Sequence, residues 1–176
     1  MAAIFAHKQG GSINVLKLIK LLYLADRESL KRYGAPISFD NFVSMDNGPV
    51  LSKTLDLING FVEGSEAAKW DEWLSDREQH TISLMRNFER NDLDELSEVD
   101  LEIINTIWKL FGHMDQWSLV DYTHKYCSEW KNPHGSQCPI NDEDILIAVG
   151  IEPAIATDLA ENIQAQRKLD IYLSRL

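Results

Sequence analysis

The segment from Val15 to Tyr33 contains neither glycine nor proline, and its apolar residues recur at the spacing of one helical face. Gly34 then offers a left-handed C-terminal position, and Pro36 prevents the helix from continuing. Ser12 precedes the run and is expected to cap the N-terminus of the helix. We therefore predict a long helix that forms the spine of a helical core, with an apolar face made of Val15, Leu18, Ile19, Leu22 and Ala25.

The other face of this predicted helix is basic, and it carries Lys17, Lys20, Arg27 and Lys31. Such a face is ordinarily solvated. Charge is unevenly distributed along the chain. Residues 1–34 hold six Lys/Arg and two Asp/Glu, whereas residues 35–176 hold eleven Lys/Arg and twenty-six Asp/Glu. A chain with a net charge of −11 repels nucleic acid over most of its surface and favours a basic protein partner. We expect no direct binding of nucleic acid.

The segment from Ile37 to Val50 has no helical pattern, and its residues 46–49 (Asp-Asn-Gly-Pro) form a turn signal. We expect positive φ at Gly48. Pro49 suits the first turn of a helix, because its missing N–H is not needed there. The pattern therefore predicts a helix from Pro49 to about Val62.

Apolar residues on both sides of the polar segment 75–80 predict a small β-hairpin between Trp70 and Met85. Ser97 and Asp100 resemble a capping box for a helix that ends at Gly112. Further helices are expected after the caps Asp115 and Asn141 or Asp142, and after Pro153, where the last helix covers residues 153–175.

These elements predict a mainly α protein: a single compact helical domain of about seven helices over residues 1–176, with a small β-hairpin insert. No apolar stretch approaches the ~20 residues of a membrane span, and the first residues lack the pattern of a secretory signal. We expect a cytoplasmic protein without membrane contact. Its two cysteines are then expected to be free thiols.

The sequence lacks the common phosphate-loop, nucleophile-elbow and zincin motifs. A metal-dependent enzyme remains the alternative, since thiolates and imidazoles at these spacings can surround one zinc ion, in a site made of His124, Cys127, His134 and Cys138. A buried cysteine and a hydrogen-bonded histidine explain the same residues without a metal. We therefore expect no catalytic residues, no metal and no cofactor.

Several ordered blocks of the sequence resemble the Panacea domain of SocA-like antitoxins and phage-associated proteins. The first is KLIKLLYLADRESLKRYGAPI followed by FVSMDNGPV, and the later ones are LSEVDLEIINTIWKLFG, WSLVDYTHKYCSEW and INDEDIL. The resemblance covers about residues 3–149. It implies a bacterial antitoxin that neutralises a protein toxin, encoded by an adjacent gene, through direct binding. It also implies an alternative, an adaptor that delivers its toxin to a cellular protease.

The resemblance extends to individual positions, most of which have a sufficient structural interpretation as packing, turn or hydrogen-bonding residues. The family-like positions are Lys17, Lys20, Leu21, Tyr23, Leu24, Asp26, Arg27, Tyr33, Gly34, Gly48, Pro49, Val50, Thr123, His124 and Trp130. For toxin binding we favour exposed basic residues and aromatic residues, which dominate interface hot spots. The predicted partner-binding residues are Lys17, Lys20, Arg27, Lys31, Trp70 and Trp73.

Overall fold

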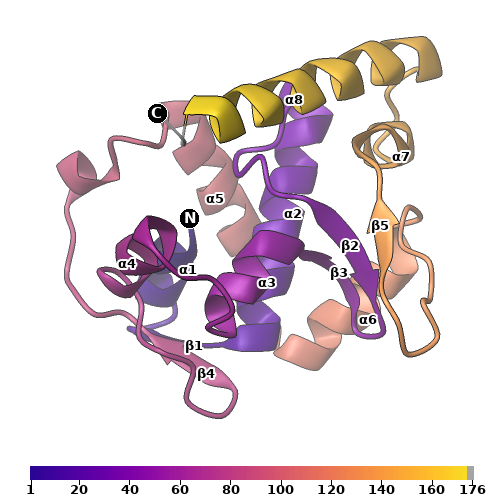
Figure 1. Cartoon of the computed structure of the whole chain (residues 1–176). Coiled ribbons are helices and arrows are strands. Elements are labelled where there is room, and N and C mark those ends of the chain that lie inside the picture. Colours follow the sequence, from indigo (N-terminus) through magenta and orange to yellow (C-terminus); the bar gives the residue numbers. More distant parts are fainter. Residues whose placement is uncertain (174–176) are drawn as a thin grey trace.

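The computed structural model describes residues 1–173, which form eight α-helices and two small antiparallel β-sheets that lie toward the periphery (Figure 1). The predicted mainly α class is confirmed, with eight helices in this part of the chain instead of about seven. The elements are α1 (Ala2–Lys8), β1 (Ser12–Asn14), α2 (Val15–Tyr33), β2 (Phe42–Met45), β3 (Gly48–Leu51), α3 (Ser52–Ile58), α4 (Ser65–Asp71), β4 (Thr81–Ser83), η1 (Arg90–Leu93, a 3-10 helix), α5 (Glu98–Phe111), α6 (Gln116–Tyr126), β5 (Cys138–Ile140), α7 (Asp142–Ala148) and α8 (Pro153–Leu173).

Helix α2 is the predicted spine, and α1, α5, α6, α7 and β3 all pack against it (Figure 1). Its apolar face is almost completely buried. Gly34 ends the helix with a φ of 73°, as the sequence predicts. The predicted N-cap is wrong, because Asn14 accepts the Lys17 N–H at 3.2 Å, while Ser12 lies in β1.

A three-stranded antiparallel sheet with the order β3-β2-β5 lies beside α2. Phe42 of β2 is opposite Leu51 of β3 and Ile140 of β5. The predicted positive φ at Gly48 is confirmed, at 97°. The predicted helix start at Pro49 is wrong, because Pro49 lies in β3 and α3 begins only at Ser52. Antiparallel pairing of β3 with β2 outweighs the local helical pattern here.

The predicted hairpin between Trp70 and Met85 is found in part. Trp70 belongs to α4, but isolated antiparallel bridges join Leu74 to Leu84 and Glu78 to Thr81. The returning strand, β4, pairs with β1. The insert is therefore anchored to the segment just before the spine helix.

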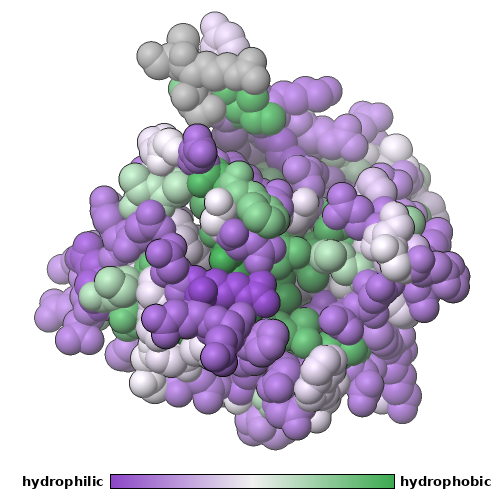
Figure 2. All heavy atoms as spheres, turned by 60° about the horizontal axis from the view of Figure 1, so that its bottom comes forward, coloured by the Kyte–Doolittle hydropathy of each residue, from purple (hydrophilic) through white to green (hydrophobic). Residues whose placement is uncertain are grey.

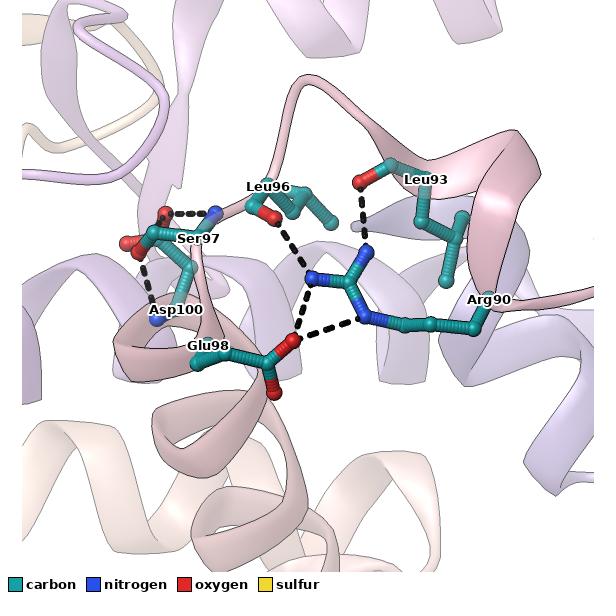
Figure 3. A network of polar contacts seen from close by, with 6 residues as sticks. All are labelled: Arg90, Leu93, Leu96, Ser97, Glu98 and Asp100. Atoms are coloured by element: carbon teal, nitrogen blue, oxygen red, sulfur yellow. Dashed lines mark hydrogen bonds and ion pairs between the residues drawn. The ribbon is translucent and has the colours of Figure 1, made fainter.

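The start of α5 confirms the predicted capping box. Ser97 Oγ accepts the Asp100 N–H, and the Asp100 carboxylate accepts the Ser97 N–H at 2.9 Å (Figure 3). Arg90 extends this network, because its guanidinium donates to Glu98 and to the carbonyls of Leu93 and Leu96 (Figure 3). The chain before the helix is thus tied to its first turn.

Helix α8 begins at Pro153, as predicted, and crosses one end of the molecule (Figure 1). Arg167 fixes it through an ion pair with Asp142 and hydrogen bonds to the carbonyls of Phe39 and Asp40. The last two residues of the predicted helix, 174 and 175, lie outside the described residues. Within residues 1–173, no helix combines the length and the apolar character needed to span a membrane.

Candidate interaction site

Two lysines of α2 lie inside the protein and bind backbone carbonyl groups. Lys17 Nζ donates to Gly112 O at 2.7 Å, at the end of α5, and Lys20 Nζ donates to Pro49 O at 2.7 Å, in β3. Their residues are 8% and 0% exposed. The expectation of a solvent-facing basic stripe is therefore wrong for both, because their ammonium groups tie α2 to neighbouring elements.

Gly48 lies next to the Lys20 ammonium. A Cβ atom at Gly48 would lie 3.0 Å from Lys20 Nζ and 2.7 Å from Thr123 Oγ1. Burial lowers the pKa of Lys20 to about 7, and the neighbouring Cys127 thiol opposes this effect only in part. The turn, the lysine and α6 therefore meet at one crowded polar junction.

His124 and Trp130 complete this junction from the side of α6. Their rings stack with centroids 3.9 Å apart, and Trp130 Nε1 donates to Met45 O at 2.9 Å. His124 bonds the backbone of Asp46, while its buried Nε2 has no hydrogen-bond partner among the described residues. Burial lowers the pKa of His124, and the charge of Lys20 adds to the effect. Both residues hold the β2–β3 turn against α6.

A second buried network surrounds Glu129, which follows α6. Its carboxylate accepts the Tyr23 hydroxyl at 2.5 Å and Arg27 Nε at 2.7 Å. Burial raises the pKa of Tyr23 well above its ordinary value, and the charge of Glu129 adds to the effect. Arg27 is thus an internal ion-pair partner, with its side chain 20% exposed.

Asp26 is buried on α2 and acts through hydrogen bonds to the loop after this helix. Its carboxylate accepts the N–H groups of Ile37 and Ser38 and the Ser38 hydroxyl, and its charge also acts on the buried amino group of Met1. Burial raises its pKa to about 6, against the effect of these hydrogen bonds. Asp26 therefore holds the loop that follows Gly34.

A surface pocket of about 340 Å³ opens above Lys20, between the start of α2, the β2–β3 turn, the turn before β4 and the start of α6. Figure 2 looks onto the side of the molecule that carries these turns and shows apolar surface near its centre, bordered by hydrophilic side chains. The lining residues are Asn14, Val15, Leu16, Ile19, Lys20, Met45, Asn47, Gly48, Val50, Leu55, Arg77, His80, Gln116 and Trp117.

The charged and titratable residues that line this pocket are all basic. Lys20 lies at its buried side, Arg77 and His80 lie at its exposed rim, and no aspartate or glutamate lines it. Arg77 is fixed by neutral acceptors, the carbonyl of Gln79 and the side-chain oxygen of Asn59. The charged residues of the pocket are therefore opposite in sign to the chain's net charge of −11.

A family profile described as "Antitoxin SocA-like, Panacea domain" matches residues 18–131. The chain belongs to this antitoxin family. No curated protein and no solved structure matches it. The matched segment includes most of α2, the β2–β3 hairpin, α5 and α6, which together form the junctions around Lys20 and Glu129.

Most family-like positions of this antitoxin-family chain have structural roles. Tyr23, Asp26, Gly34, Gly48, Pro49, His124 and Trp130 all take part in the junctions, turns or core described above. Tyr33 differs, since it is 53% exposed at the end of α2.

The structure does not bring the predicted partner-binding residues together. Lys31 is exposed at the C-terminal end of α2, far along the helix from Lys17 and Lys20. Trp70 and Trp73 are half-buried and line a separate hollow of about 540 Å³ next to α1. They do not share the pocket above Lys20.

The four candidate metal ligands are also dispersed. Cys127 is buried, whereas Cys138 is exposed, and both are free thiols as predicted. Burial raises the pKa of Cys127 to about 12, and the charge of Glu129 adds to the effect. In residues 1–173, no three His, Cys, Asp or Glu side chains are arranged so that they could hold one metal ion.

Sequence reasoning missed two rim residues of the pocket, Arg77 and Trp117. Trp117 is 57% exposed although its helix buries Leu119, Val120 and Thr123. Its position outside this apolar stripe was a usable signal, because a large aromatic residue away from the core face is available for contacts. No local signal identifies Arg77.

Proposed function

We propose that this chain is an antitoxin that neutralises a cognate protein toxin by direct binding, without catalysis of its own. The observation that carries the proposal is the match to the SocA-like antitoxin family over residues 18–131. The proposal includes an adjacent gene as the source of the toxin and a bacterial or phage-associated origin.

The chemistry of the buried polar groups supports a binding role. Lys17 and Lys20 donate hydrogen bonds to backbone carbonyl groups inside the protein. Glu129 accepts a hydrogen bond from Arg27. A catalytic group needs access to a substrate and a pKa matched to its task. The buried polar side chains instead stiffen the scaffold, which lowers the entropic cost of binding a partner.

Side chains that are at least partly accessible provide the contact surface in this proposal. They include Lys31, the accessible part of Arg27, and the half-buried Trp70 and Trp73. Since the chain carries a net charge of −11, a basic toxin fits it best.

The adaptor role is a second candidate, and the end of α8 favours it. Leu169, Tyr172 and Leu173 are 49%, 64% and 54% exposed on this last part of the helix. Exposed apolar side chains on a helix can bind a groove of another protein. A protease would engage this segment while the toxin occupies another surface.

Co-expression tests the main proposal. The adjacent open reading frame is expressed alone, together with this chain, and together with a copy of this gene that carries an early stop codon. We expect growth arrest, rescue and renewed arrest, respectively, and a stable complex of the two proteins on size exclusion. Rescue by the stop-codon copy, or a toxin that never binds the chain, contradicts the proposal.

The adaptor role is separated by following toxin abundance after protein synthesis stops. An unchanged abundance in the presence of the chain indicates masking. A faster loss, abolished when α8 is truncated after Arg167, indicates delivery to a protease.

A further inference from the structure

The hollow next to α1 has an apolar wall that another protein can reach. We call it the tryptophan hollow, after Trp70 and Trp73 in its lining. Its volume of about 540 Å³ lies within the range of ligand sites, roughly 300–1,000 Å³, and accommodates one or two side chains. Six of its apolar residues are partly exposed, namely Met1, Ile37, Trp70, Trp73, Leu93 and Leu96. Because these side chains already reach the surface, a partner can contact them without rearrangement of the core.

Carboxylates dominate the charged part of the tryptophan hollow. They belong to Glu72, Asp92, Asp94 and Glu95, and the basic side chain among the lining residues is Lys69. Asp92 pairs with Arg86 at 2.9 Å, and Glu95 lies 4.0 Å from Lys69 Nζ. The lining therefore keeps an excess of negative charge.

Glu72 and Asp94 are exposed, and their carboxylates form no ion pair or hydrogen bond with the part of the chain that the structure describes. The Met1 amino group does not offset their charge at about pH 7.5, because burial lowers its pKa to about 6. A cationic group of a partner can therefore pair with these carboxylates without breaking an existing contact.

The segment that carries Leu93 and Leu96 is held in place within the chain itself. The Arg90 guanidinium donates to the carbonyl groups of both leucines and to the Glu98 carboxylate at the start of α5 (Figure 3). A wall that is already fixed loses little conformational entropy when a partner binds. The Arg90 network thus prepares one side of the tryptophan hollow for contact.

Two other hollows of the described chain differ in charge. The one beside α8 has four basic and four acidic side chains in its lining, and its Arg167 is paired with Asp142. The pocket above Lys20 has basic residues and no carboxylate in its lining. The tryptophan hollow is therefore the one of the three that suits a cationic occupant.

We propose that the tryptophan hollow binds a basic segment of the toxin, with an apolar side chain against Trp70 and a neighbouring lysine or arginine paired with Glu72 and Asp94. This inference rests on the proposed function. Charge selects the occupant, because a second copy of this chain would bring a net charge of −11 to an acidic rim, whereas a basic toxin is attracted to it. The toxin segment needs both features, since the apolar side chain supplies the buried anchor and the cation supplies specificity.

The preference for a cation is tested first without a toxin, on the full chain. Phenethylamine, phenethyl alcohol and hydrocinnamate share one apolar tail and differ in charge, and NMR follows the indole N–H signals during their titration. We expect phenethylamine to shift the signals of Trp70 and Trp73 in a saturable way and to bind at least about fivefold more tightly than hydrocinnamate, with phenethyl alcohol between them. The signals of Trp117 and Trp130 should stay unchanged. Equal binding of the amine and the carboxylate, or shifts outside the hollow only, would overturn the proposal.

Variants assign the preference to the two carboxylates and the contact to the indole. Glu72→Gln with Asp94→Asn should weaken phenethylamine about three- to tenfold and leave phenethyl alcohol unaffected. Asp158→Asn with Glu161→Gln makes the same change of charge at exposed positions of α8, outside the hollow, and should behave as the parent. Trp70→Ala, on a helix without fully buried residues, should weaken both probes alike. Unchanged phenethylamine binding in the first double variant would overturn the assignment.

The occupant is tested in the toxin complex with Glu72→Lys plus Asp94→Lys and with Trp70→Ala, beside Asp158→Lys plus Glu161→Lys. We expect both hollow variants to dissociate at least about tenfold faster at an unchanged melting temperature, whereas the control on α8 changes association alone. Parent dissociation rates in both hollow variants, with rescue intact, overturn this inference and leave the antitoxin role standing.

Two further outcomes concern the partner itself. A dimer of this chain that is lost in Trp70→Ala would overturn the toxin as occupant. Phenethylamine binding without any neutralised toxin would contradict the antitoxin role, and with it the toxin as occupant.

Discussion

At Gly48, the sequence predicts the backbone conformation but not its surroundings. The Asp-Asn-Gly-Pro pattern predicts positive φ because glycine lacks the Cβ that disfavours it. The contacts with Lys20 and Thr123 join residues 28 and 75 positions away in the sequence, and no local pattern reveals them. Because of these close contacts, a side chain at Gly48 should be tolerated less well than at a turn glycine that faces open space.

We expect Gly48→Ala to lower the free energy of unfolding by about 1–3 kcal/mol more than Gly10→Ala does. Gly10 is the matched control, because its φ of 100° resembles the 97° of Gly48 while nothing lies within 4 Å of an added Cβ. The difference therefore measures crowding at Thr123 and Lys20 separately from backbone strain. Chemical denaturation of both variants provides the measurement, and equal losses would contradict the crowded junction.

Lys20 and Lys17 show where the sequence misleads at the residue scale. A lysine on the polar side of an amphipathic pattern is normally solvated. Here each ammonium binds a carbonyl group, 29 residues away for Lys20 and 95 for Lys17. Only the tertiary arrangement supplies these acceptors, so the expectation of an exposed stripe failed for both residues.

The buried lysine gives a pH dependence of stability. Because the pKa of Lys20 falls from 10.5 to about 7 on folding, the unfolded chain binds more protons between these values. Stability contributed by Lys20 is therefore fully present above pH 10.5 and is lost progressively as the pH falls from there to about 7. We expect the parent to gain up to about 1.4 kcal/mol per pH unit relative to Lys20→Met between pH 7 and 9.

Other groups titrate in or near the same range, so the comparison with Lys20→Met is essential. Burial lowers the pKa of the Met1 amino group to about 6, and it raises that of Cys127 to about 12. Both effects occur in parent and variant and largely cancel in the difference. Urea unfolding at pH 7, 8 and 9 measures it, and parallel pH profiles would show that Lys20 stays fully charged in the folded protein.

At the scale of elements, several helix starts were predictable because their capping signals are local, although those of α2 and α3 were misplaced. Ser97 with Asp100, Asp115 and Pro153 all begin helices where the sequence places them. The sheet was not predictable, since β2 pairs with β5, whose residues 138–140 lie 94 to 98 positions after their partners in β2. The apolar residues after Pro49 pair with β2, and read in sequence alone they resemble the start of a helix.

The capping box at the start of α5 has a measurable effect. We expect Ser97→Ala to lower the free energy of unfolding by about 0.5–2 kcal/mol, because the Asp100 N–H loses its acceptor. Ser128→Ala, an exposed serine outside a helix, is the control and should stay within about 0.5 kcal/mol of the parent. Thermal melts compare the two, and a neutral Ser97→Ala would show that Arg90 and Glu98 suffice to hold this end.

At the scale of the whole molecule, the sequence predicts a negative net charge, and the structure shows a pocket whose charged lining residues are basic. The net charge of −11 is visible in the composition. The basic pocket is not, since Lys20 of α2 and the turn that carries Arg77 and His80 are distant in the sequence and meet only in the fold. Trp70 and Trp73, predicted as contact residues, lie at another hollow, and their role in binding stays a prediction.

This separation of charge predicts how the complex forms. An acidic surface attracts a basic toxin over several ångströms, and salt screens that attraction, whereas a contact inside a pocket is screened less. We therefore expect the association rate constant to fall at least about tenfold from about 50 to about 500 mM salt, with a smaller change in dissociation. Stopped-flow mixing at several salt concentrations measures both rates. Glu152→Lys combined with Glu161→Lys, at exposed positions just before and within α8, changes the net charge from −11 to −7. This double variant should associate more slowly at low salt and dissociate at an unchanged rate. An association rate that ignores both salt and these substitutions would remove electrostatic attraction from the mechanism and leave shape complementarity as the basis of toxin selection.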